Sequence, residues 1–180
     1  MPGGGKSTVG RQLARRLGAP FADSDAVIEQ RIGRPIRAYF EQEGEERFRE
    51  LESSVLEELI DTTVGVIATG GGIALRASNR DALRTKTICV YLRSTPEELF
   101  RRLRHDTKRP LLQVADPLAR LRELFSARDH LYREAAQFVI ETGRPSVPTL
   151  VNMILMQLEL AGAIDPSGVP SPVDTPASKR

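Results

Sequence analysis

Apolar positions recur at two different spacings along this chain, and segments with the two spacings alternate. Val9, Leu13 and Leu17 stand four residues apart with arginines between them, which predicts an amphipathic helix that ends at Gly18. Short runs of consecutive apolar residues, typical of strands buried on both faces, separate the helical segments. These runs predict four strands, at residues 19–22, 64–69, 87–92 and 138–140.

Helical spacing fills most of the chain between the predicted strands. Strands that alternate with helices predict an α/β fold, in which helices cover both faces of a parallel sheet in three layers. Aspartate and proline mark helix starts, as at Asp116 and Pro117. Beyond the first helix, we expect helices at residues 26–32, 37–42, 45–61, 79–86, 97–104 and 117–136, and from residue 146 onward.

The composition fits one globular domain, which we place at residues 1–161 of the 180. After Gly162 the chain becomes rich in proline and serine, so we expect a disordered tail at residues 162–180. A net charge of +2 gives no indication of a nucleic-acid partner, and no apolar run is long enough to span a membrane. The single cysteine, Cys89, excludes an internal disulfide and is expected in a buried strand. We therefore predict a cytoplasmic location.

The most specific motif stands at the amino end, directly before the first predicted helix. Glycines let backbone N–H groups converge on phosphate oxygens, and the helix adds its unpaired amino-terminal donors. A lysine that follows can reach the β- and γ-phosphates, and the next hydroxyl can bind Mg²⁺. The alternative is a glycine-rich helix cap without a ligand. We interpret this motif as a P-loop for ATP. Its residues are Gly3, Gly4, Gly5, Lys6, Ser7 and Thr8.

The full P-loop pattern, G-x-x-x-x-G-K-[ST], has a further glycine that would stand directly before Met1. A strand precedes the loop in this motif. We therefore expect the first strand of the sheet to be missing from the chain. Two hypotheses are open: translation that begins upstream, or a shortened version of the motif.

Two carboxylates follow the first predicted strand, at the end of the sheet where ligands bind in open α/β folds. If the strand continues through Asp23 and Asp25, the two side chains project to the same side. Asp23 would then face Mg²⁺ together with Ser7, and Asp25 would face the hydroxyl that accepts the phosphoryl group. Both could instead be ordinary helix caps. The adjacent P-loop favours the functional interpretation.

Three further groups are candidates for binding anions or substrate. Arg49 and Glu52 stand three residues apart, which fits either a surface ion pair or an arginine held ready for a carboxylate, and spacing alone leaves both open. The glycines at 70–72 end the second strand and would let a ligand approach the backbone. The basic segment at about 105–115 is either a mobile lid over the phosphates or a solvated loop.

Taken in order, the motifs resemble those of bacterial shikimate kinases. They are G-G-G-K-S-T, D-S-D, F-R-E-L-E, G-G-G, R-P-L-L and A-R-D-H-L-Y, and the likeness runs from Met1 to about Ala161. The resemblance implies a nucleoside-monophosphate-kinase-like fold with a five-stranded parallel sheet and a mobile lid. It also implies transfer of the ATP γ-phosphate, with Mg²⁺, to the 3-hydroxyl of shikimate, a step toward chorismate and the aromatic amino acids.

At the nucleotide, the resemblance assigns Lys6 to the phosphates and Ser7 and Asp23 to Mg²⁺. It implies that Arg109 of R-P-L-L reaches the phosphates from the lid. Arg102 and Pro145 would sandwich the adenine.

At the second substrate, the resemblance implies that Asp25 contacts the shikimate hydroxyls and serves as the base. Arg49 and Arg128 would bind the shikimate carboxylate, with Glu52 beside Arg49. Backbone approach to the substrate would come from Gly70, Gly71 and Gly72.

Two competing functions are weighed against this one. A kinase for another polyol acid such as gluconate would share the P-loop, but F-R-x-x-E together with R-P-L-L argues against it. A ligand sensor fused to a DNA-binding domain would need a helix-turn-helix segment, which the sequence does not contain. We expect small-molecule partners only, shikimate and ATP, with no nucleic acid and no membrane, and a monomer.

Overall fold

The computed structural model describes residues 5–103, 114–143 and 145–165. Helices and parallel strands alternate along these residues, as the sequence predicts. The elements in chain order are α1 (Lys6–Leu17), β1 (Phe21–Asp23), α2 (Ser24–Ile32), α3 (Ile36–Thr62), β2 (Val66–Ala68), the 3-10 turn η1 (Ile73–Leu75), α4 (Ala77–Lys86), β3 (Val90–Arg93), α5 (Pro96–Leu103), α6 (Pro117–Ala135), β4 (Phe138–Glu141) and α7 (Val147–Leu160).

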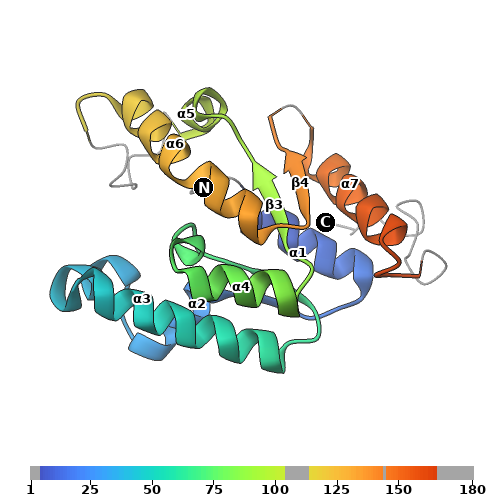
Figure 1. The fold of residues 1–180 in the computed structure, drawn as a ribbon, viewed down its shortest axis with the longest axis horizontal. Helices are drawn as coiled ribbons and strands as arrows, with labels where there is room; N and C mark the ends of the chain where they lie inside the picture. Colours follow the sequence, from blue (N-terminus) through green and yellow to red (C-terminus); the bar gives the residue numbers. More distant parts are fainter. Residues whose placement is uncertain (1–4, 104–113, 144, 166–180) are drawn as a thin grey trace, which may run out of the picture.

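The four strands of the described residues form two separate parallel pairs. β1 pairs with β2 in the register Phe21 to Val66, and β3 pairs with β4 in the register Val90 to Phe138. Figure 1 shows β3 and β4 beside α7, with α2, α3 and α4 grouped on the other side of the molecule. The parallel α/β class is therefore confirmed, with the sheet layer divided into two halves.

Apolar side chains pack on both sides of this divided sheet. On one side, Val9 of α1 and Ile154 of α7 share a core with Leu92 of β3. On the other, Tyr91 of β3 joins a core with residues of α3, α4, α5 and α6, among them the fully buried Leu99. Neighbouring residues of β3 thus point to opposite helix layers, which is the three-layer arrangement that the pattern predicts.

Several element boundaries differ from the sequence-based prediction. The helices expected at 37–42 and 45–61 form one element, α3, with a kink at Gly44, whose φ of 84° is a conformation that glycine adopts most readily. The first three strands are shorter than predicted, whereas β4 extends one residue further, to Glu141. β3 begins after Cys89 rather than including it. Cys89 is half-buried, and burial raises the pKa of its thiol to about 11.

Three predicted helix ends are confirmed. Asp116 accepts a hydrogen bond from the Ala119 N–H at 2.9 Å, and Ser146 caps α7 in the same way. Gly18 ends α1 with a φ of 60°. Within the described residues, no helix is long and apolar enough to cross a membrane.

Three predictions fall wholly or mostly on residues that the structure does not describe. The lid with Arg109 and almost all of the tail at 162–180 lie outside the described residues, as do Gly3 and Gly4. They stay predictions.

The core makes a direct stability prediction. Leu121 of α6 is 1% exposed, so Leu121→Ala should lower the free energy of unfolding by about 2–5 kcal/mol. Leu160→Ala is the control because that side chain is 77% exposed, and its effect should stay within about 0.5 kcal/mol. Urea unfolding measures both. Equal effects would show that α6 is not part of the core.

Candidate active site

The described start of the predicted P-loop has two features that favour an anion. Gly5 caps α1 with a φ of 74°, and Lys6, Ser7 and Thr8 form the first turn without any acidic residue. The amino end of a helix carries unpaired N–H groups and positive dipole charge, both of which favour phosphate. This end of α1 therefore suits the phosphates of a nucleotide.

Asp23 links the P-loop helix to the end of the first strand. One carboxylate oxygen, Oδ2, accepts a hydrogen bond of 2.5 Å from the Ser7 hydroxyl, and the other, Oδ1, accepts one of 3.1 Å from the Asp25 N–H. The second bond makes Asp23 the N-cap of α2. The capping and functional interpretations of this residue are thus compatible, because one carboxylate serves both contacts.

Asp25 does not lie on an extended strand with Asp23, so the predicted geometry of this pair is wrong. β1 ends at Asp23, and Asp25 lies in the first turn of α2. The two acids are nevertheless close. Surrounding protein raises the pKa of the Asp25 carboxyl by desolvation, and the Asp23 charge raises it further, while Lys6 and Arg49 oppose the change. Asp25 is exposed, so solvent screens part of this effect.

Arg49 and Glu52 form a buried ion pair rather than a surface one. The Arg49 Nη1 donates to Glu52 Oε2 at 2.6 Å, and the two side chains are 13% and 2% exposed. The guanidinium also lies 5.2 Å from the Phe48 ring. Burial raises the pKa of Glu52 although Arg49 lowers it. This geometry holds Arg49 in a fixed orientation, which spacing alone left undecided.

The triple glycine packs directly against this charged pair. A Cβ added to Gly70 would lie 2.5 Å from Asp25 Oδ1 and 3.2 Å from Glu52 Oε1, and one added to Gly72 would collide with the Arg49 guanidinium. Side chains at these positions would displace the charged groups. The glycines therefore let the loop approach Asp25, Arg49 and Glu52 closely.

Two side chains that the sequence did not single out position this loop. Ser24, fully buried, accepts a hydrogen bond from the Gly70 N–H at 3.1 Å. The Tyr132 hydroxyl on α6 donates to the Gly71 carbonyl at 2.5 Å. Tyr132 belongs to the A-R-D-H-L-Y motif, so the sequence contained a signal that could have identified it as a site residue. Ser24 stands between two acids, and nothing in the sequence distinguishes it from a residue that only separates them.

Arg128 reaches the same cluster from α6. Burial raises the pKa of both Glu52 and Tyr132, and the positive charge of Arg128 acts in the opposite direction on each. The structure thus gathers Asp25, Arg49, Arg128 and the glycine loop around one place.

Arg102 lies at the other predicted end of the site. Its guanidinium donates to the carbonyl of Thr142, just after β4. Pro145 follows three residues later and is half-buried. The structure therefore brings Arg102 to the segment that contains Pro145.

The metal ligands predicted from sequence are in contact with each other through the Ser7–Asp23 hydrogen bond. Among the described residues, no group of three or more histidine, cysteine, aspartate or glutamate side chains could hold a metal ion. One hydroxyl and one carboxylate suit Mg²⁺, which is bound in proteins by few side chains together with phosphates and water.

A phosphate-binding loop that opens a helix in a parallel α/β fold defines a P-loop nucleotide-binding protein. Comparison with known proteins narrows this class. The family model for shikimate kinase matches residues 2–159. Curated shikimate kinases are similar to the chain: one from Paracidovorax citrulli is 59% identical over 93% of each chain, and one from Ralstonia nicotianae is 54% identical over 94% of this chain and 90% of its own.

Solved structures agree with the sequence comparison. The shikimate kinase from Acinetobacter baumannii in complex with shikimate has a TM-score of 0.82 at 45% identity, over 91% of this chain and 90% of its own. The enzyme from Bacteroides thetaiotaomicron has a TM-score of 0.81 at 32% identity, over 88% and 94%. The chain belongs to the shikimate kinase family.

The loop contact yields a prediction about Ser24. Ser24→Ala leaves the buried Gly70 N–H without its acceptor, so unfolding should cost about 1–3 kcal/mol less and the Gly70 amide should exchange hydrogen faster. Ser53→Ala is the matched control because that hydroxyl bonds only within its own helix, to the Arg49 carbonyl. An unchanged Gly70 exchange rate in Ser24→Ala would contradict the assigned contact.

Proposed function

We propose that the chain transfers the γ-phosphoryl group of ATP to the 3-hydroxyl of shikimate, forming shikimate 3-phosphate and ADP. The observation that carries this proposal is the packing of the triple-glycine loop on Asp25, Arg49 and Glu52. Membership of the shikimate kinase family and the likeness to a structure in complex with shikimate support the choice of substrate.

Shikimate would lie between cations and an acid. Arg49 and Arg128 bind the carboxylate, a role that suits the planar guanidinium, and the buried Glu52 keeps Arg49 oriented. Asp25 binds the hydroxyls, while backbone groups of Gly70, Gly71 and Gly72 complete the contact. A carboxylate at one end and hydroxyls at the other match this distribution of charge.

ATP would bind along the amino end of α1. The glycines at residues 3–5 and the side chains of Lys6 and Thr8 hold its phosphates. Arg109 contributes from the lid to the transferring phosphoryl group, and Arg102 with Pro145 holds the adenine.

Ser7 and Asp23 fit a bound Mg²⁺, since their oxygens already meet at 2.5 Å. The ion, when bound with ATP, neutralises phosphate charge. The chain's own part is to hold the two oxygens in place: Asp23 is anchored by its cap on α2.

Asp25 is the base in this reaction. Its carboxylate accepts the proton of the 3-hydroxyl as that oxygen forms a bond to the γ-phosphorus and the bond to the β-phosphate oxygen breaks. Desolvation and Asp23 make the carboxylate more basic than an ordinary aspartate. Lys6 and Arg109 stabilise the charge that develops on the phosphoryl oxygens.

The proposed partners are small molecules. That the enzyme is a monomer and lies in the cytoplasm remains a prediction.

The substrate is tested by a coupled ADP-release assay with shikimate or gluconate at equal concentration. We expect ADP release with shikimate and little with gluconate. Equal or greater turnover of gluconate would overturn the substrate assignment.

The base is tested by Asp25→Asn. Removing the proton acceptor should lower kcat about 10²- to 10⁴-fold while ATP binding, measured by calorimetry, stays nearly unchanged. Unchanged turnover would remove Asp25 from this role.

The carboxylate contact is tested by Arg49→Ala. Losing a charge-assisted contact should raise the KM for shikimate about 10- to 100-fold, with a smaller effect on the KM for ATP. Arg37→Ala is the control, since Arg37 stands on the same helix in an exposed pair with Glu41. A defect confined to ATP would contradict the assignment.

The basicity of Asp25 predicts a pH effect. A base must be ionised, so kcat/KM should fall as pH drops through the pKa of Asp25, which lies above its ordinary value. The Glu29 charge raises that pKa, so Glu29→Gln should move the acid limb to lower pH and leave the plateau unchanged. Glu57→Gln, which removes an exposed charge from α3, is the control. An acid limb that stays in place or moves upward would exclude Asp25 as the titrating base.

A further inference from the structure

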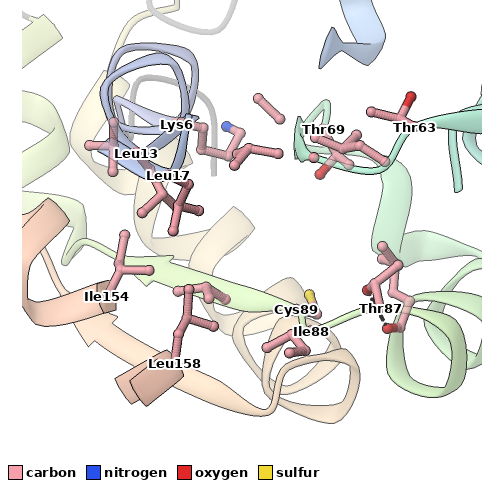
Figure 2. A pocket seen from close by; sticks show the side chains of 18 of the residues that line it. Lys6, Leu13, Leu17, Thr63, Thr69, Thr87, Ile88, Cys89, Ile154 and Leu158 are labelled. Carbon is pink, nitrogen blue, oxygen red and sulfur yellow. Dashed lines mark hydrogen bonds between the residues drawn. The ribbon is translucent and has the colours of Figure 1, made fainter. Parts of the chain in front are cut away.

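A cluster of hydrogen-bonded polar side chains lies between β3 and α6, and none of its members binds a substrate in the proposed function. Side chains alternate along β3, so Val90 and Leu92 line an apolar cavity of about 380 Å³, and Figure 2 shows Ile154 of α7 beside that cavity. Tyr91 and Arg93, in the alternate positions, contact α6 instead. One face of β3 thus presents a hydroxyl and a guanidinium to this helix.

Asp129 of α6 accepts hydrogen bonds from both of these donors. Its Oδ1 accepts one of 3.0 Å from the Tyr91 hydroxyl and another of 3.0 Å from the Arg93 Nε. Its Oδ2 accepts a third, of 2.8 Å, from the Nε of Arg133 one turn further along α6. The side chain of Asp129 is only 17% exposed, so water competes little for these bonds. Asp129 therefore ties α6 to β3.

The Asp129 carboxyl carries a negative charge at neutral pH. Burial raises its pKa, but the hydrogen bonds from Arg133, Arg93 and Tyr91 outweigh that effect, and the pKa lies below its ordinary value. Hydrogen bonds between a carboxylate and a guanidinium are shorter and stronger than those between neutral groups. The contact with Arg93 is therefore the stronger of the two links to β3.

Arg93 has little freedom to move away from Asp129. Its Nη1 donates to Glu141 of β4 at 2.9 Å, and its guanidinium carbon lies 4.9 Å from the centre of the Phe125 ring. Phe125 stands four residues before Asp129, so the two side chains lie one above the other on the same face of α6. Contacts with Arg93 from two successive turns fix the rotation of α6 about its own axis.

The adjacent face of α6 carries the side chains that reach the candidate active site. Arg128 and Tyr132 stand four residues apart, one turn of the helix. Burial raises the pKa of the Tyr132 hydroxyl, and the charge of Arg128 and a hydrogen bond with it oppose that rise. The same hydroxyl donates to the Gly71 carbonyl at 2.5 Å. A rotation of α6 would therefore move Arg128 and Tyr132 together, away from the glycine loop.

An aromatic contact joins the two faces of α6 through β3. The ring centres of Tyr91 and Tyr132 lie 5.0 Å apart, with 34° between the ring planes. Tyr91 thus has its hydroxyl on Asp129 and its ring against Tyr132. A displacement of Tyr91 would be passed to Tyr132 and from there to the Gly71 carbonyl.

We propose that Asp129 is a positioning residue for shikimate, because it fixes the rotation of α6 on β3. With this rotation fixed, Arg128 and Tyr132 stay directed at the glycine loop and at the shikimate carboxylate. Asp129 acts through these neighbours, since its own two oxygens are bonded to β3 and to the next turn of α6. Its effect on shikimate rests on the proposed function, whereas its effect on the glycine loop does not.

The test compares Asp129→Ala with Glu123→Ala in the full chain. Glu123 stands on the same helix in an exposed pair with Arg120, so its removal leaves the contact with β3 intact. For Asp129→Ala we expect the KM for shikimate to rise at least fivefold, with kcat and the KM for ATP within twofold of the unchanged chain. A merely structural role would lower the folded fraction and hence kcat, without this split. Glu123→Ala should change none of the three.

Two milder variants separate the contact from the loss of a side chain. Asp129→Asn keeps an oxygen that can accept from Tyr91 and Arg93, so it should return the KM for shikimate to within about twofold of the unchanged chain. Tyr91→Phe keeps the ring and serves if Asp129→Ala does not fold, and it should raise the KM for shikimate at least twofold. An unchanged KM for shikimate in Asp129→Ala or Tyr91→Phe would overturn the proposal, as would an equal rise for ATP.

Hydrogen exchange tests the positioning role without any substrate. In Asp129→Ala the Gly70 amide should exchange at least threefold faster, while the Val66 amide, bonded to the Pro20 carbonyl at the other end of β2, keeps its rate. Equal acceleration of both amides, or of neither, would contradict the role of Asp129. If Gly70 alone exchanges faster but the unchanged chain does not phosphorylate shikimate, the positioning role stands and the proposed kinase function fails.

Discussion

The structure depends on the close packing of a glycine loop against charged side chains that have little room to move. Gly70 leaves no space for a Cβ beside Asp25 and Glu52, and Gly72 leaves none beside Arg49. Ser24 and Tyr132 hold the loop in this position from α2 and α6. Because the groups are assembled before any substrate arrives, binding does not have to order them.

This packing also accounts for the electrostatics. Carboxyl groups of Asp25 and Glu52 share a region where burial disfavours their charged forms, so the pKa of each is raised. Arg49 forms an ion pair with Glu52 at 2.6 Å, whereas the charges of Lys6 and Arg49 lower the pKa of Asp25 without cancelling the rise caused by desolvation and Asp23. The result is one carboxylate committed to structure and one left basic and accessible, a division of labour that suits a base beside an orienting ion pair.

Much of this could be read from the sequence. Periodicity predicted the helices and their caps, and the order of the motifs identified the family. Spacing could not decide whether Arg49 was exposed, because burial depends on Phe48 and on a glycine loop far along the chain. The role of Ser24 was invisible for the same reason: its partner, Gly70, lies 46 residues away. The alternation of side chains along a strand also gave the wrong position for Asp25. Asp23 caps α2 through the Asp25 N–H, so the chain is already helical at Asp25.

The central claim is that the fold keeps Asp25 more basic than an ordinary aspartate before substrate binds. The most direct test is a carbon-13 NMR titration of the aspartate side-chain carboxyls, with Asp25→Asn used to assign the resonance. We predict a pKa above the ordinary aspartate value of 3.8. A pKa at or below that value would contradict the account.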